Sequence, residues 1–486
     1  MSLPPTPAQQ RSSQSPLPSG EARLPPDPSG VVRLNLVQRV LAHPYSSATL
    51  VTLLAMGIVT VVRQHSEWDE TYIGAAQALQ QGKDIYRAVP TDTYPPFSAW
   101  FFVPFTHLPL RLARGIWWAI CAVSLVTLVK MAWRLAGGPQ MEPIGGRPAT
   151  SLREHAAFLI GHAIALQFTL NALTHCQTDL PIAALVMIGC AALAQERFYR
   201  GAIWIGLGAA FKATPLLFAP YLLLRRQWGA AIVLVAVMVG CNLLPDTVHR
   251  PDRYIWLIRW TSHYVSPMAK SDYIPGDWKN NLNNNQSLAG AAGRWLNSSP
   301  KEDSEALRSV RRPGAAPTPI VRGLLGGLCI AVMVPVAWAW RRRQARATPE
   351  YSAPAAEGTV RAETANLPAV SSNAPAQVNP HMIECGIVLL LMVLFSPNSS
   401  RAHFCVLYLA AFCVARMAVR PGASSSLRIL LAIAVLCATL TIHLRLPFTR
   451  GIEQLLLWIG IVMLSTIFLL LASCLGLAGS PPAKRL

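Results

Sequence analysis

Long apolar runs, separated by short polar segments, dominate this chain of 486 residues. Several runs reach about 17–23 residues, the length that an α-helix needs to cross the hydrocarbon core of a bilayer. A soluble protein of this size would interrupt such runs with charged faces. Spans are expected near 46–62, 112–133, 155–173, 179–195, 228–245, 321–340, 382–395, 403–419, 427–444 and 453–475. The pattern therefore predicts an all-α integral membrane protein.

The segment 201–224 departs from this pattern, because Arg200 precedes it and the pair 225–226, both arginine, follows it. Basic residues at span ends prefer the cytoplasm, and one ordinary helix cannot begin and end on the same side. Two short half-crossing helices that meet at the proline-containing turn 212–215 satisfy both clusters. Irregular backbone at membrane depth is tolerated only inside protein or beside a water-filled cavity, so Lys212 should face a cavity. The total is about 12 transmembrane helices.

Composition divides the chain into five parts. Residues 1–45, rich in Pro, Ser and Gln, are expected to form a disordered cytoplasmic tail. Residues 341–380 are rich in Arg and then in Ala, Pro and Ser, as in a flexible cytoplasmic linker. The other parts are a membrane module at 46–340 with outer loops at 63–111 and 246–320, C-terminal transmembrane helices at 381–476, and a cytoplasmic tail at 477–486.

The net charge of +19 raises the question of nucleic-acid binding. The basic residues, however, collect at span ends and in short loops, as at 341–343. This is the distribution that orients membrane helices and contacts anionic lipids, so we expect membrane lipids and no nucleic acid as partners. Most of the 10 cysteines lie within apolar runs and no CxxC occurs, so they indicate buried apolar side chains and no metal site.

Polar side chains gather in segments that this topology places on the outer side. Asp69 follows the first span, and a carboxylate held at the membrane surface can accept a proton from a hydroxyl group. The other segments are 175–179, the turn at Lys212, and 396–403. A carboxylate facing Lys, Arg and His suits transfer from a phosphate leaving group, because the cations stabilise the charge that grows on phosphate. Glu67 and Glu70 are rival candidates for the base.

The long loop 246–320 adds amide-rich and aromatic material. Tyr254, Trp256, Trp260 and Tyr264 form a stretch typical of the lipid headgroup region. The run 283–287, Asn-Asn-Asn-Gln-Ser, offers donors and acceptors that suit sugar hydroxyls.

The order of these motifs resembles glycosyltransferase family 87, the polyprenol-phosphate-mannose-dependent mannosyltransferases with the GT-C fold. The resemblance runs from about residue 46 to about residue 410 and rests on an outward Asp69 and on the motifs Gly82-Lys83-Asp84-Ile85-Tyr86, Tyr94-Pro95-Pro96, Gln177, Lys212-Ala213-Thr214-Pro215, Asn285-Gln286-Ser287-Leu288 with Arg294, and Ser396-Pro397 with His403. It implies a GT-C-type multi-span bundle with outward-facing loop helices.

The resemblance also implies a function: an inverting membrane transferase that moves a hexose, expected to be mannose, from a polyprenyl-phosphate donor to a lipid or glycan acceptor. The site would face the extracytoplasmic side of the plasma membrane, with Asp69 as the base and no required cofactor or metal. Donor phosphate contacts are expected from Lys212, Arg401 and His403, and substrate contacts from Tyr86, Tyr94, His175, Gln177, Asn285, Ser287 and Arg294.

This chain departs from the family pattern at three sites, one of which covers two residues. Ala402 replaces the first of two histidines, Ser400-Arg401 stands where a Trp-acidic pair is common, and Asp179 stands where Asn is usual. The departures leave open which donor is used.

Other interpretations remain for both residues and chain. Lys212 suits a snorkelling lysine, and His403 an interfacial histidine. His175 and Gln177 suit a tight turn, and Tyr94-Pro95-Pro96 a rigid extended segment. For the chain, the alternatives are transfer of arabinose, glucose or a whole oligosaccharide, a lipid-linked-sugar transporter or flippase, and a scaffold. A transporter would place polar residues along a midplane path and often contains inverted repeats.

Overall fold

The computed structural model describes residues 44–63, 66–139, 151–251, 254–269, 283–297, 318–347, 378–440 and 450–480. The regular elements in these residues are all helical, as the apolar pattern predicts. Six described helices are long and apolar enough to cross a membrane, and five shorter apolar helices accompany them. Most of the tail expected at 1–45, of the linker at 341–380 and of the tail at 477–486 lies outside the described residues.

The helices follow the predicted spans closely. The first span and the first outer loop form α2 (Pro44–Val62), η1 (Asp69–Ile73), α3 (Gly74–Gln80), α4 (Ile85–Ala88), α5 (Phe97–Phe102) and η2 (Val103–His107). The central part comprises α6 (Leu110–Leu135), α7 (Leu152–Thr174), α8 (Asp179–Ala194), α9 (Phe198–Phe211), η3 (Thr214–Leu217), α10 (Phe218–Leu224), α11 (Trp228–Leu243) and η4 (Leu244–Thr247). The remainder comprises α12 (Trp256–Trp260), η5 (Thr261–Val265), η6 (Ser266–Ala269), α13 (Leu288–Asn297), α14 (Thr318–Ala347), α15 (Pro380–Phe395), η7 (Arg401–Leu407), α16 (Tyr408–Ala418), α17 (Ser425–Thr439), α18 (Arg450–Ile459) and α19 (Ile461–Gly479).

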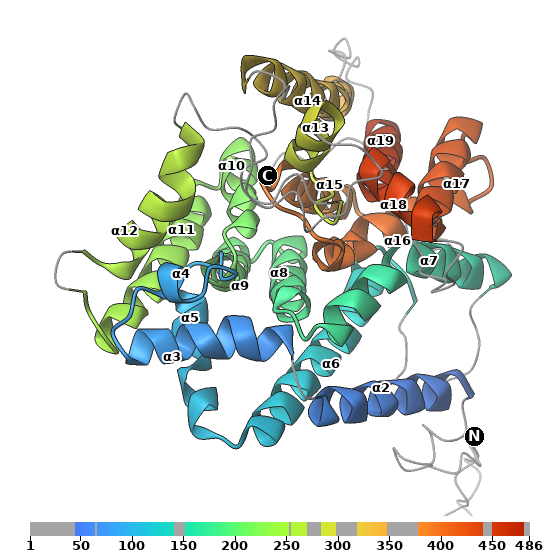
Figure 1. Cartoon of the computed structure of the whole chain (residues 1–486). Helices are drawn as coiled ribbons and strands as arrows, with labels where there is room; N and C mark the ends of the chain where they lie inside the picture. Colours follow the sequence, from blue (N-terminus) through green and yellow to red (C-terminus); the bar gives the residue numbers. More distant parts are fainter. Residues whose placement is uncertain are drawn as a thin grey trace, which may run out of the picture.

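Helix α8 lies near the centre of the bundle, in contact with α6 and α9 (Figure 1). Small residues let α8 and α9 approach closely: a Cβ atom added at Gly189 would lie 3.0 Å from the carbonyl oxygen of Gly201, and the reciprocal distance is also 3.0 Å. In a membrane, where hydrocarbon surrounds the helices, such backbone contact replaces hydrophobic burial as a source of association. Helix α16, almost wholly buried, packs against α7, α15 and α19.

The break expected within 201–224 is confirmed. Helix α9 ends at Phe211, Lys212 adopts extended angles (φ −151°, ψ 118°), and the short η3 leads into α10. Pro215 stands in the first turn of η3, where its missing N–H is not needed. The extended residue therefore lies between two helices, and its side chain is free to leave the helix axis.

The span expected at 453–475 is two helices. Gly460 has φ +89°, a left-handed conformation that a residue with a side chain rarely adopts, and it separates α18 from α19. Helix α18 is amphipathic and packs against α13, which lies in the same outer region. Helix α19 alone has the length and apolar character of a span.

Helices α2 and α14 lie at the edges of the bundle (Figure 1). Large apolar side chains on both point away from the protein, among them Ile58 at 66% exposure and Ile330 at 66%. An aqueous surface would not tolerate two such helices, whereas lipid tails solvate them without cost. The chain is therefore a multi-pass membrane protein.

A buried ion pair joins three helices at the end of the bundle where α7 begins. Arg416 of α16, 3% exposed, donates to both carboxylate oxygens of Glu154, at 2.7 and 3.0 Å, and to the carbonyl oxygen of Ala136 at 2.7 Å. We expect Glu154→Gln to destabilise the folded protein by roughly 3 kcal/mol, because it leaves a buried guanidinium uncompensated. Thermal unfolding in detergent should show a lower midpoint, and Glu196→Gln, at an exposed residue, should leave the midpoint unchanged.

Candidate active site

A cavity of about 540 Å³ opens where the segments that were predicted to lie on the outer side converge. Its walls come from the first outer loop, the turn between α7 and α8, the break at Lys212, the α12–η5 segment, the turn before α13 and the segment that precedes η7. The lining residues are Glu67, Thr71, Tyr72, Thr91, Thr93, Tyr94, Pro95, Asn171, His175, Gln177, Lys212, Ala213, Thr214, Trp260, Tyr264, Val265, Asn284, Asn285, Ser396, Pro397, Asn398, Ser400, Arg401 and His403. Segments far apart in the sequence thus share one cavity, as the predicted topology requires.

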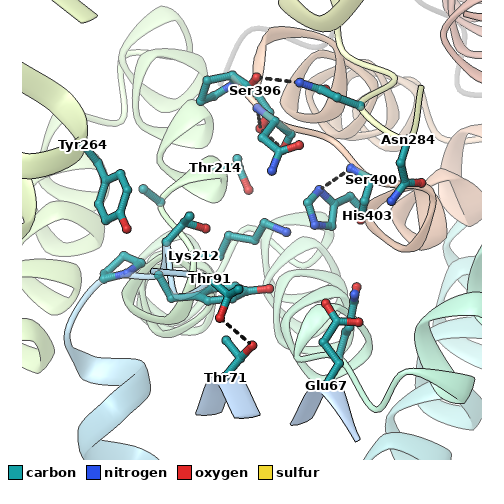
Figure 2. A pocket seen from close by; sticks show the side chains of 18 of the residues that line it. Glu67, Thr71, Thr91, Lys212, Thr214, Tyr264, Asn284, Ser396, Ser400 and His403 are labelled. Carbon is teal, nitrogen blue, oxygen red and sulfur yellow. Dashed lines mark hydrogen bonds between the residues drawn. The ribbon is translucent and has the colours of Figure 1, made fainter. Parts of the chain in front are cut away.

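Lys212 reaches across the centre of this cavity toward His403 (Figure 2). Its ammonium group donates to Oδ1 of Asp179 at 2.8 Å, and Nε2 of His403 lies 3.8 Å from Oδ2 of the same carboxylate. The side chains of all three residues are largely buried, at 15%, 13% and 5% exposure for Lys212, His403 and Asp179. Charge-assisted contacts of this kind are short and directional, so they fix the lysine in one position.

A second cation lies on the same side of the cavity. Arg401, the first residue of η7, contacts Oε1 of Glu453 on α18 at 3.2 Å. The backbone N–H of Ser400 donates to Nδ1 of His403 at 3.2 Å, which orients the ring at the start of η7. Lys212, Arg401 and His403 therefore form one cationic and hydrogen-bonding wall.

Glu67 lies on the opposing part of the cavity wall (Figure 2). Its Oε2 lies 3.2 Å from Nδ1 of His175, and its side chain is 54% exposed. The hydrogen bond from His175 holds the pKa of the Glu67 carboxyl below its usual range, so the carboxylate is ionised at neutral pH. Of the described residues that line the cavity, Glu67 alone is a carboxylic acid.

Two tyrosines also line the cavity. The hydroxyl of Tyr72 donates to the hydroxyl of Tyr94 at 2.8 Å, and the ring centroid of Tyr94 lies 5.7 Å from the Lys212 ammonium. Burial raises the pKa of both tyrosines well above the usual range, so both hydroxyls keep their protons. They act as fixed hydrogen-bonding groups.

Asp69, the expected base, points elsewhere. It accepts hydrogen bonds from the Arg114 guanidinium, 2.9 Å from Nε to Oδ1, and it is absent from the residues that line the cavity. Arg114 is 3% exposed, so the pair lies between η1 and α6. Glu70 is exposed and also lies outside the lining. Of the three rivals, Glu67 is the one that faces the cavity; the role of Asp69 stays a prediction.

The other expected contacts divide into two groups. Tyr94, His175, Gln177, Lys212, Asn285, Arg401 and His403 line the cavity, whereas Tyr86, Ser287 and Arg294 do not. Ser287 accepts from the N–H of Gly290 at 3.0 Å, as a helix N-cap does at the start of α13. Arg294, fully buried, donates to the carbonyl oxygens of Asn285 and Trp458 and so joins α13 to α18.

Trp260 and Tyr264 are contributions from the long loop that an interfacial interpretation had not assigned to the site. The indole N–H of Trp260 donates to the backbone carbonyl oxygen of Thr93 at 3.2 Å. The Tyr264 hydroxyl donates to the backbone carbonyl oxygen of Asp92 at 2.7 Å. These bonds attach the loop to the first outer segment and turn two aromatic rings toward the cavity. Their four-residue spacing, one helical turn, was the signal in the sequence that they share a face.

The chemistry available is thus a carboxylate base opposite two cations and a histidine, in a cavity of a size that suits a sugar phosphate. Among the described residues, no group of three or more His, Cys, Asp and Glu side chains has the arrangement of a metal site.

The model of glycosyltransferase family 87 matches residues 93–356, just over half of the 486 residues. The chain belongs to glycosyltransferase family 87. The protein is therefore a glycosyltransferase, because the family consists of glycosyltransferases. The GT-C-type membrane architecture expected from the motifs agrees with the helical bundle.

Curated members similar to this family 87 chain are mycobacterial. A polyprenol-phosphate-mannose-dependent alpha-(1-2)-phosphatidylinositol mannoside mannosyltransferase of Mycobacterium tuberculosis is 26% identical over 262 residues, 51% of this chain and 58% of the relative. A polyprenol-phosphate-mannose-dependent alpha-(1-2)-phosphatidylinositol pentamannoside mannosyltransferase of the same species is 26% identical over 185 residues, 36% and 40% of the two chains. The counterpart of the latter in Mycolicibacterium smegmatis is 27% identical over 175 residues, 34% and 39% of the two chains. The matches therefore span between about two fifths and three fifths of each relative's length.

Proposed function

We propose that this protein transfers a hexose, mannose in the first instance, from a polyprenyl phosphate carrier to a hydroxyl group of a lipid or glycan acceptor. The observation that carries the proposal is the composition of the cavity: Glu67 faces Lys212, Arg401 and His403 across a space of about 540 Å³. The curated relatives, whose names specify a polyprenol-phosphate-mannose donor, support this choice.

The reaction follows from this arrangement. Glu67 takes the proton of the acceptor hydroxyl, whose oxygen attacks the anomeric carbon from the face opposite the phosphate. The bond from the anomeric carbon to the phosphate oxygen breaks, the configuration inverts, and the phosphate leaves with one additional negative charge. Lys212 and Arg401 stabilise that charge, and His403 supplies a hydrogen-bonding ring beside them. Each side chain is already oriented by its own partner, so little reorganisation is required.

The membrane position of the site fits a lipid-linked donor. The basic residues at span ends favour an amino terminus in the cytoplasm, and this supports a cavity on the extracytoplasmic side of the plasma membrane. A polyprenyl tail can then remain in the bilayer while its phosphate enters the cavity. The relatives' names specify phosphatidylinositol mannosides as acceptors, and the acceptor here is proposed to be of that broad kind, a membrane-anchored polyol or glycan.

A transfer assay tests the function directly. Purified protein in lipid vesicles should move radiolabelled mannose from polyprenyl phosphate mannose to a mannosylated phosphatidylinositol, and the product should be an α-linked glycolipid. GDP-mannose, offered alone to the same vesicles, should give no product. Absence of transfer from polyprenyl phosphate mannose, glucose and arabinose alike would contradict the proposal and favour movement of an intact lipid-linked sugar across the bilayer.

The Glu67–His175 contact makes the acid limb of the pH profile informative. Transfer needs ionised Glu67, so activity should fall as pH drops through its lowered pKa. We expect His175→Ala to raise that pKa and shift the acid limb of kcat/KM to higher pH, because the largest cause of the lowering is removed. Profiles measured between pH 3.5 and 7 test this; an unmoved limb contradicts the assignment of Glu67.

A further inference from the structure

A buried carboxylate outside the cavity lining lies close to two residues of that lining, Lys212 and His403. Asp179, the first residue of α8, is 5% exposed and does not line the cavity. Its two oxygens face different elements: Oδ1 lies 2.8 Å from the Lys212 ammonium at the break after α9, and Oδ2 lies 3.8 Å from Nε2 of His403 on η7. One side chain thus connects three segments that are far apart in the sequence.

The two contacts differ in quality. Oδ1 accepts a short, charge-assisted hydrogen bond from Lys212. Oδ2 is buried and has no hydrogen-bond partner in the described part of the chain. An unsatisfied buried carboxylate oxygen is costly, so a donor within reach gains by moving toward it.

His403 presents such a donor. The N–H of Ser400 donates to Nδ1 of the ring, so in the neutral imidazole the hydrogen is on Nε2. Nε2 is the nitrogen 3.8 Å from Oδ2; because the ring also hydrogen-bonds the backbone of Asn398, a small rotation would let Oδ2 share or take over that hydrogen bond. Asp179 therefore acts on Lys212 through a hydrogen bond and on His403 through an electrostatic contact at 3.8 Å.

We propose that Asp179 is a positioning residue for transfer, which holds the Lys212 ammonium and the His403 ring at the place where the donor phosphate binds. This inference rests on the proposed function. Lys212 has a flexible four-carbon stem, and its bond to Asp179 uses one of three N–H donors, which leaves two for phosphate oxygens. Holding a cation in place before the charge develops lowers the barrier more than its charge alone would.

A purely structural role explains the arrangement less well. Replacing a buried ion pair by apolar groups is often neutral or stabilising, so an ion pair beside a cavity is weak evidence of a stabilising device. The pair Glu154–Arg416, at the far end of α7 and α16, has that structural character and lies outside the cavity. Asp179 differs because both of its neighbours line the cavity.

A double-mutant cycle separates the two roles. Asp179→Asn keeps the shape of the side chain and removes its charge; we expect kcat for mannose transfer to fall by roughly 10- to 100-fold, with a smaller change in the KM of the donor. In a Lys212→Ala background the same substitution should lower kcat by a clearly smaller factor, because the ammonium that Asp179 positions is already absent and only the contact to His403 remains. Asp179→Glu should recover part of the lost rate.

Glu154→Gln is the matched control, since it also breaks a buried ion pair. Its effect on transfer, per amount of folded protein, should be the same in both backgrounds. If Asp179→Asn lowers kcat by equal factors with and without Lys212, the positioning role is wrong while the transferase function stands. If the wild-type protein transfers no sugar at all, the failure belongs to the proposed function instead. Circular dichroism and gel filtration of each variant identify any loss of fold.

Discussion

Glu67→Gln should abolish most transfer while leaving the donor bound. A glutamine has the shape of the glutamate and keeps a contact to His175, but it cannot accept the proton of the acceptor hydroxyl. General base catalysis contributes about 10²- to 10⁴-fold, so kcat should fall by at least about two orders of magnitude. The KM of the donor should change little, because the proposed phosphate contacts come from other residues of the lining, Lys212, Arg401 and His403. Initial rates at varied donor concentration measure both quantities.

Two neighbouring carboxylates provide controls within the same turn of the chain. Glu70 is exposed and lies outside the cavity lining, so Glu70→Gln should transfer mannose at a near-wild-type rate. Asp69→Asn weakens the contact to Arg114, and we expect a lower yield of folded protein with transfer retained by the folded fraction. A loss of transfer in folded Asp69→Asn, with Glu67→Gln still active, would return the role of base to Asp69.

Lys212→Ala should have the second large effect. The ammonium lies at the centre of the cavity, and removing one such preorganised group typically costs about 10²- to 10³-fold in kcat. Here the donor KM should rise as well, since a phosphate already carries charge in the ground state. Lys212→Arg should recover little, because a planar guanidinium cannot reproduce the contact to Asp179 and the approach to Tyr94 together.

Lys83 offers the matched control for this substitution. It is an exposed lysine of the same outer region, and Lys83→Ala removes an equal charge without touching the cavity lining. Wild-type kinetics in Lys83→Ala, with a large loss in Lys212→Ala, would show that position and not net charge matters. Equal effects of the two substitutions would indicate general attraction of the anionic lipid to a basic surface.

The break at Lys212 was predictable because its evidence was local: arginines on both sides, a proline within and a charge at membrane depth. The sequence could not predict, in contrast, whether the Asp69 side chain faces the cavity. Glu67, Asp69 and Glu70 lie within four consecutive positions, about one helical turn. Successive side chains on a helix point about 100° apart, so the three carboxylates point in different directions. Which of them faces the cavity depends on the π-helical η1 and on Arg114 of α6, two features that only the folded chain reveals.

The roles of the polar residues at 283–294 were also not predictable from the sequence. Its amides, hydroxyl and guanidinium suit sugar recognition, and the same groups also suit backbone recognition. In the structure Ser287 caps α13, and Arg294 donates to the carbonyl oxygens of Asn285 and Trp458. Asn285 both lines the cavity and donates to the carbonyl oxygen of Pro397 at 3.0 Å. Sequence alone cannot divide such groups between substrate and scaffold, because the partner carbonyls are distant along the chain.

The cavity draws its chemistry from both ends of the chain. Glu67 precedes the region 93–356 that identifies the family, and Arg401 and His403 follow it. A protein recognised by that central region alone can thus retain the helices from α5 to α14 and the lysine, yet carry neither the proposed base nor the proposed phosphate contacts from η7. Family membership and catalytic competence are separable in this architecture. A genome survey for active transferases should therefore examine both flanking segments for the site residues. Sequences that have lost both segments are candidates for family members with a different function.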